Sequence, residues 1–164
     1  MGGELKLEKD FVGREISGYM VDRYINSGKS AAVFECHRGS SKYAIKIFFP
    51  EIVEKFGHEI QVVRIARELG LKNHGIDNLV NIIDCGAINL ESNSIHFIVM
   101  DFIDGINIKQ FIASGIEYDE AFIKRVIGIL ISVTEQLIIK GIAHRDVKPE
   151  NIMIRNDGVV KSDV

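Results

Sequence analysis

The chain has 164 residues, of which 46% are hydrophobic and 26% charged, as in an ordinary globular domain. Its formal net charge is -3, so no overall attraction draws it toward nucleic acid or an anionic membrane surface. The five histidines and two distant cysteines do not cluster at the spacing of a zinc site. Composition therefore excludes polyanion binding as a first hypothesis and indicates a domain with an ordinary core.

The N-terminal segment 1–17 is charged and lacks the apolar core of a signal peptide. From Gly18 to Phe49, short runs rich in Val, Ile, Tyr and Phe alternate with the polar stretches NSGKS and RGSS. This pattern predicts three successive antiparallel strands joined by short turns. The most apolar stretch, 122–139, carries charged side chains and falls short of a membrane span. We therefore expect a cytoplasmic protein that binds neither membrane nor nucleic acid.

After Pro50 the period becomes helical, and Gly70 is placed to end a helix over residues 50–70. Two further strands are predicted in residues 79–88 and 94–103, joined by a polar turn. The order of three strands, a helix, two strands and then helices indicates an α+β fold with a sheet-rich first half.

A second helix is predicted over residues 119–140, with Asp119 as its N-cap. Its apolar residues recur three and four positions apart, and additional isoleucines widen the stripe over much of the circumference. Exposed surfaces of this kind drive association, so we expect something to cover the helix. In this chain alone we expect self-association, exchange of elements with a neighbouring copy, or a poorly ordered last third.

The stretch HRDVKPENIMI, residues 144–154, is the most informative part of the sequence. It resembles the catalytic loop of protein kinases, H-R-D-L-x-x-x-N, with the Lys-Pro-Glu-Asn continuation usual in serine/threonine kinases. The resemblance implies that Asp146 accepts or orients the proton of the substrate hydroxyl and that Asn151 holds a magnesium ion. It also implies that Lys148 lies close to the transferred phosphate.

If the resemblance holds, a lysine must stand on the third strand. KYAIKIF supplies Lys46, preceded by Ala44, in a context similar to the family's V-A-I-K. By resemblance, Lys46 neutralises the α- and β-phosphates of ATP and is held extended by a glutamate of the following helix. Glu59 and Glu68 compete for this role, and they face roughly opposite sides of one continuous helix. The family's intervals favour Glu68, with Glu59 as the open alternative.

The stretch FIVMDFIDG resembles the strand and hinge that receive adenine in this family. Under that match Met100 guards the back of the pocket. The backbone of Asp101 and Ile103 would then hydrogen-bond the base.

INSGKSAAVF contains Gly-Lys-Ser, which also ends the phosphate loop of many nucleotide hydrolases. That loop needs a glycine where this chain has Arg23, and it must continue into a helix, whereas AAVFECH predicts a strand. The kinase pattern G-x-G-x-x-G-x-V instead places Val33 at the valine and Asn26, Gly28 and Ala31 at the three glycines. Because Asn tolerates left-handed backbone angles and Ala adds only a methyl group, a strand-turn-strand cover over phosphates stays feasible.

The final segment resembles the family's hairpin after the catalytic loop, with its turn at residues 156–158. Asp163 falls where the metal-binding Asp-Phe-Gly begins, so the resemblance gives Asn151 and Asp163 as magnesium ligands. It extends from about Gly18 to Asp163 and covers only part of a kinase domain. We expect a fragment of a longer kinase, with a shortened and inactive product as the alternative.

The predicted architecture is a protein-kinase-like α+β fold in three parts: an N-terminal extension (1–17), an N-lobe with hinge (18–103) and the beginning of a helical C-lobe (104–164). The N-lobe is expected to hold a five-stranded antiparallel sheet and one main helix. The expected activity is transfer of the γ-phosphate of magnesium-ATP to serine or threonine hydroxyls of a protein substrate by the parent kinase, with the fragment alone inactive. The alternative is a kinase-like module that binds a nucleotide or a partner without turnover, which the depleted glycine loop and Val164 after Asp163 support.

Overall fold

The computed structural model describes four stretches of the chain, residues 11–49, 75–90, 93–144 and 147–162. They divide into two compact units, with one boundary between Phe102 and Ile103. Residues 75–80, predicted to belong to the N-lobe, group with the second unit instead. The division into 1–17, 18–103 and 104–164 stays a prediction. The predicted helix over 50–70 lies outside the described residues.

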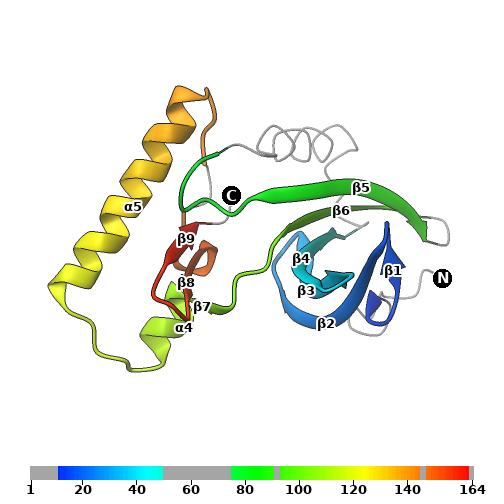
Figure 1. The fold of residues 1–164 in the computed structure, drawn as a ribbon, viewed down its shortest axis with the longest axis horizontal. Coiled ribbons are helices and arrows are strands. Elements are labelled where there is room, and N and C mark those ends of the chain that lie inside the picture. Colours follow the sequence, from blue (N-terminus) through cyan, green and yellow to red (C-terminus); the bar gives the residue numbers. More distant parts are fainter. Residues whose placement is uncertain (1–10, 50–74, 91–92, 145–146, 163–164) are drawn as a thin grey trace. The chain divides into compact units, whose positions relative to one another are not determined.

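The first unit is a six-stranded antiparallel sheet in the order β1-β2-β3-β4-β6-β5 (Figure 1). Its strands are β1 (Glu15–Ile16), β2 (Tyr19–Ser27), β3 (Ala31–Arg38), β4 (Ser41–Phe48), β5 (Ile82–Leu90) and β6 (Asn93–Asp101). The predicted count of five strands is wrong by one, because β1 was not foreseen. β1 turns back onto β2 through Ser17 and Gly18, which both have positive φ angles. A two-residue strand is too short to show alternation in the sequence.

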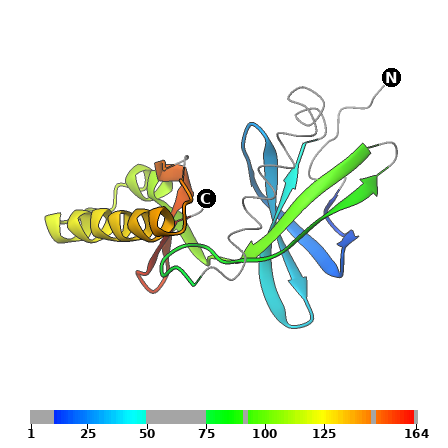
Figure 2. The same ribbon diagram turned by 90° about the horizontal axis from the view of Figure 1, so that it is seen from above.

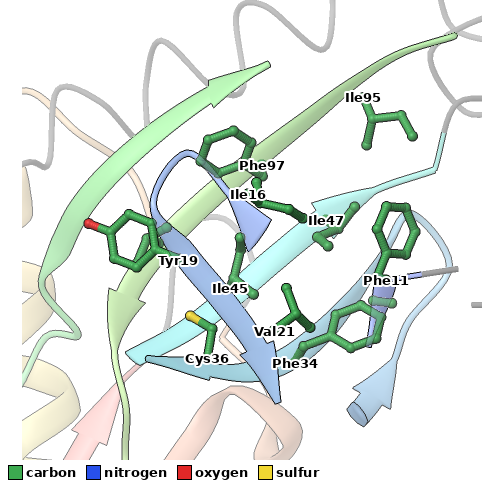
Figure 3. Packing of buried hydrophobic residues seen from close by; sticks show 12 residues of the cluster. Phe11, Ile16, Tyr19, Val21, Phe34, Cys36, Ile45, Ile47, Ile95 and Phe97 are labelled. Carbon is green, nitrogen blue, oxygen red and sulfur yellow. The ribbon is translucent and has the colours of Figure 1, made fainter. Parts of the chain in front are cut away.

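The core of the first unit lies on one face of this sheet, as Figure 3 shows. Phe34 and Cys36 of β3 and Ile45 and Ile47 of β4 are all at most 1% exposed. Phe11 closes over them, with its ring centroid 5.8 Å from that of Phe34. Because successive side chains of a strand point to opposite faces, the residues between these core positions lie on the other face of the sheet.

The second unit combines a three-stranded antiparallel sheet with two helices (Figure 2). Its elements are β7 (Gly105–Asn107), α4 (Ile108–Ala113), α5 (Glu120–Ile139), the one-turn 3-10 helix η1 (Pro149–Asn151), β8 (Ile152–Arg155) and β9 (Val160–Ser162). The predicted hairpin of β8 and β9 is confirmed, and the Arg155 N–H donates to the Val159 carbonyl at 2.8 Å across its turn. The third strand, β7, was not predicted.

The predicted second helix is confirmed as α5, with Asp119 accepting a hydrogen bond from the Phe122 N–H at 2.7 Å. Its buried residues are Val133 and Leu137. The isoleucines that widen the stripe remain uncovered by the described residues, being between 42% and 66% exposed: Ile123, Ile127 and Ile138. Ile131, on the same helix, is 54% exposed. Within the part of the chain that the structure describes, no helix is long and apolar enough to cross a membrane.

Gly105 in β7 lies too close to β8 to carry a side chain. A Cβ there would overlap the carbonyl oxygen of Ile154 and would lie 2.8 Å from the Cα of Arg155. We expect Gly105→Ala to lower the free energy of unfolding, measured by urea denaturation, by about 1–3 kcal/mol, the usual cost of overpacking.

Gly128, in the interior of α5, provides the control. A Cβ at Gly128 meets no atom within 4 Å. Since alanine is favoured over glycine in a helix interior by about 1 kcal/mol, Gly128→Ala should be more stable than the wild type. Equal stability of Gly105→Ala and the wild type would contradict the close approach of β7 to β8.

Candidate functional site

The face of the first sheet opposite its core carries most of the predicted nucleotide-site residues. Residues directly opposite each other in an antiparallel sheet share a face. The register forms two neighbouring rows across β3, β4 and β6, namely Val33–Lys46–Ile98 and Glu35–Ala44–Met100. Val33, Ala44, Lys46 and Met100, which are separated in the sequence, are therefore brought together on one surface.

Lys46 is half-buried in the middle of β4. Its Nζ lies 5.8 Å from the ring centroid of Phe48, two residues further along the same face, within the range of a cation–π contact. The predicted carboxylate partners, Glu59 and Glu68, lie outside the described residues. Which of the two glutamates pairs with Lys46 therefore stays a prediction.

The stretch around Gly28 forms a strand-turn-strand hairpin. The Gly28 N–H donates to the Ala31 carbonyl at 2.9 Å, and Asn26 lies opposite Val33. Because β3 is a strand, the exclusion of a hydrolase-type phosphate loop is confirmed. The left-handed backbone that we allowed for Asn26 is not used, since β2 stays extended as far as Ser27.

The predicted hinge begins at the end of β6. Met100 is only 7% exposed and occupies the row of Ala44. The Asp101 N–H already donates to the Asn81 carbonyl at 3.0 Å. If the base contacts Asp101, the backbone group that serves it is therefore the carbonyl. Ile103 directly follows the boundary between the two units, which lies after Phe102.

Glu35 is a buried charge on this same face that the sequence analysis missed. Its side chain is 7% exposed, and its two carboxylate oxygens bind different cations. Oε2 accepts from the Arg23 guanidinium, at 2.8 Å from Nε and 2.6 Å from a terminal nitrogen, and Oε1 lies 2.8 Å from the Lys42 Nζ. The hydrogen bond from Lys42 is the main reason that the pKa of Glu35 is lowered, and Arg23 adds to it against the opposing effect of burial. The sequence does indicate the face on which Glu35 lies, because Glu35 stands two residues after Val33 and alternate residues of a strand share a face.

In the second unit, the catalytic-loop motif begins at a buried residue. His144 is 7% exposed, and its Nε2 lies 2.7 Å from the Ser162 Oγ. Ser162 is itself held by the backbone, because its N–H donates to the Asn78 carbonyl at 2.7 Å and its carbonyl accepts from Val80 at 2.8 Å. This network fixes the residue directly before Asp163, which lies outside the described residues.

The motif ends in the short helix η1, which begins after Lys148. The Asn151 N–H donates to the Lys148 carbonyl at 2.9 Å, and Glu150 pairs with Lys109 at 2.9 Å. Lys148 is exposed and Asn151 is half-buried. Asp146 lies outside the described residues.

The predicted magnesium ligands are an amide oxygen of Asn151 and a carboxylate of Asp163. Such hard oxygen donors suit magnesium, which usually keeps several waters and binds substrate phosphates rather than a cage of protein ligands. Among the described residues, no group of three His, Cys, Asp or Glu side chains could hold a metal ion. The oxygen donors of Asn151 and Asp163 would fit magnesium bound together with phosphates.

The sequence matches the model of the protein kinase domain over residues 19–162. The chain belongs to the protein kinase family. A probable serine/threonine-protein kinase of Streptomyces coelicolor is 29% identical to this kinase chain over 152 residues, covering 90% of the chain and 22% of that relative. The probable serine/threonine-protein kinase PknB of Lactococcus lactis is 30% identical over 149 residues, with coverages of 87% and 22%. This kinase chain thus spans about a fifth of the length of these relatives.

Solved kinase domains have the same fold. A mutant of the PknI kinase domain from Mycobacterium tuberculosis is similar with a TM-score of 0.76 at 19% identity, covering 92% of this chain and 60% of that one. PpkA-294 in its apo form gives a TM-score of 0.77 at 19% identity, with coverages of 93% and 60%. The predicted α+β fold of a partial kinase domain is confirmed.

The lowered pKa of Glu35 predicts a loss of stability in acid. In the folded protein this carboxylate stays ionised at pH values below its ordinary pKa of 4.5. A depressed pKa contributes stability above the unfolded value, and this contribution is lost as the pH falls through the folded value. We expect the free energy of unfolding from urea denaturation to fall as the pH drops below about 4.5, and to fall less steeply in Glu35→Gln.

Glu150→Gln is the matched control for this pH series. The pKa of Glu150 is also lowered, mainly by the hydrogen bond from Lys109, but its side chain is 41% exposed. Exposed ion pairs contribute little to stability, so this variant should keep the pH dependence of the wild type. A Glu35→Gln variant with that same dependence would show that Glu35 does not carry the effect.

Proposed function

We propose that this chain is the ATP-binding and catalytic-loop part of a serine/threonine protein kinase, which transfers the γ-phosphoryl group of magnesium-ATP to a protein hydroxyl. The observation that carries the proposal is the gathering of Val33, Ala44, Lys46 and Met100 on one sheet face. These residues precede the 144–151 motif in the chain order of the family. The names of the relatives support serine and threonine as acceptors.

The adenine side of the site uses small and apolar groups. Ala44 and Val33 leave room for a flat base, and Met100 closes the back of the pocket. The carbonyl of Asp101 and the backbone of Ile103 hydrogen-bond the base. On the phosphate side, the hairpin with Asn26, Gly28 and Ala31 covers the phosphates. 

Charge neutralisation and positioning carry the transfer itself, because the transition state of phosphoryl transfer is loose. Lys46 neutralises the α- and β-phosphates and is held by Glu68. Asp146 orients the attacking hydroxyl, and Lys148 lies beside the transferred group. When bound, magnesium neutralises phosphate charge, and Asn151 and Asp163 would hold it.

The activity belongs to the whole protein, since this chain spans about a fifth of its curated relatives. We propose that the chain alone is inactive and acts in the cytoplasm when part of that protein. Self-association through the exposed isoleucines of α5 is part of the same proposal for the chain alone.

Nucleotide binding is tested on the chain by thermal unfolding. Magnesium-ATP at about 100 times its dissociation constant should stabilise the wild type by about 2.7 kcal/mol and raise its Tm. Lys46→Met should show a smaller rise, because the cation facing the phosphates is lost. Lys124→Met removes an equal charge from the exposed surface of α5 and should respond like the wild type. If the wild type shows no rise, the proposed nucleotide site is wrong.

Catalysis is tested on the full-length protein by phosphate incorporation into a generic protein substrate. Asp146→Asn removes the group that orients the hydroxyl proton, and we expect kcat to fall by about 100-fold or more. Asp157→Asn is the control, since Asp157 lies in the exposed turn between β8 and β9 and pairs with Arg155. Incorporation by Asp146→Asn equal to that of the wild type would overturn the enzyme proposal and favour a module that binds without turnover.

A further inference from the structure

Strand β2 is irregular on both sides of Arg23. Along its pairing with β3, the register shifts once at Asp22 and again at Ile25, so each of these residues is extra relative to β3. Such bulges bend a strand and change which side chains face a site. The pairing of β3 with β4, in contrast, runs without a shift from Ala31 to Arg38. Of the two strands that pair with β3, only β2, which leads into the proposed phosphate cover, is irregular.

The charges of the side chains around Asp22 explain why the first bulge lies at this residue. If the register of the first residues of β2 continued, Asp22 would lie opposite Glu35, and two carboxylates directly opposite each other repel. The bulge brings Arg23 to that place instead, where its guanidinium donates to Glu35. Asp22 accepts a hydrogen bond from the Nδ1 of His37 at 2.8 Å. Each charged residue thereby meets an opposite charge or a donor.

Burial makes the Arg23–Glu35 pair an anchor for the strand. The carboxylate side chain is 7% exposed, whereas Arg23 and Lys42 are each 64% exposed. Charge-assisted hydrogen bonds of this kind are stronger than neutral ones. Removing a partner from a buried charge is costly, so alternative registers that separate Arg23 from Glu35 are disfavoured.

The second bulge determines which residues of β3 lie opposite the end of β2, and so where the hairpin lies. Without the two bulges, Asn26 would lie opposite Ala31, but with them it lies opposite Val33, in the row of Lys46. The N–H of Gly28 then closes the turn on the Ala31 carbonyl at 2.9 Å. The register of β2 thus decides which residues stand over the proposed phosphate position.

We infer that the ion pair between Arg23 and Glu35, placed between the two bulges of β2, fixes the register of the β2–β3 hairpin and makes Arg23 a positioning residue for the nucleotide phosphates. This inference rests on the proposed ATP site. Arg23 acts through the strand, because its guanidinium is bound to Glu35. Ala44 and Met100 pair directly between β4 and β6, so the adenine side does not depend on the register of β2.

The test compares magnesium-ATP with adenosine, which lacks phosphates, by titration calorimetry on this chain. Arg23→Met should weaken ATP binding by about tenfold, which corresponds to about 1.4 kcal/mol, and leave the affinity for adenosine unchanged. Arg23→Lys, which keeps the positive charge, should recover part of the loss. Lys42→Met is the matched control, since it removes the other cation from Glu35 but lies on the regular strand β4, and the ratio of the two affinities should stay that of the wild type.

Hydrogen exchange of the ligand-free protein tests the register separately. Arg23→Met should speed exchange of the amides in residues 24–27 and leave those of β4 unchanged, whereas Lys42→Met should leave 24–27 protected. Unchanged exchange in Arg23→Met overturns the inference, as does an equal loss of ATP and adenosine affinity. If the wild type binds neither ligand, the proposed function fails. If the wild type binds both ligands and Arg23→Met keeps the wild-type ratio of ATP to adenosine affinity, the inference about Arg23 is overturned while the proposed function stands.

Discussion

The unbroken register of β3 with β4 and of β4 with β6 is the constraint on which the proposed nucleotide site depends. It puts Ile45 and Ile47 into the core and Lys46 between them on the opposite face. A slip by one residue would exchange the two faces, placing the Lys46 cation among apolar side chains and the isoleucines outside. Burying an unpaired charge is costly, so the core enforces the orientation of Lys46, the lysine of the proposed site. Stability and function therefore rest on the same alternation.

The second unit poses a different problem, because the proposed site residues that the structure describes there, Lys148 and Asn151, lie outside its strands and long helices. Such residues need a rigid scaffold to hold them. The scaffold here is the small sheet β7-β8-β9, which carries the chain from η1 to the residue before Asp163. The contact of His144 with Ser162 ties the beginning of the catalytic loop to the end of β9. Two segments with separate proposed roles, hydroxyl orientation and metal binding, are thereby held by one buried contact.

Elements with a clear period could be predicted from the sequence, and those defined by pairing could not. Each feature that could be predicted lies within a single stretch of the sequence. These features are the alternation of β3 and β4, the apolar stripe and N-cap of α5, and the 144–151 motif. β1 and β7 are too short to show a period, and they exist because a neighbouring strand pairs with them. The burial of Glu35 and the bulges of β2 likewise depend on cations and carboxylates from adjacent strands. A charged residue inside a strand normally predicts exposure, so the spacing of Glu35 from Val33 indicates its face of the sheet but not its burial.

The hairpin between β2 and β3 has few glycines, and its two strands are joined by the ion pair between Arg23 and Glu35. One physical explanation covers both features. A glycine-rich loop is flexible and can adjust to phosphates after they bind. Asn26 lies in extended β2, and Ala31 is 5% exposed, so this hairpin has less freedom to adjust. A stiffer cover must already stand in the right place before the ligand arrives, because it cannot be moved there cheaply by binding. The buried carboxylate of Glu35, which selects the register through Arg23, provides that placement, replacing adaptability by preorganisation.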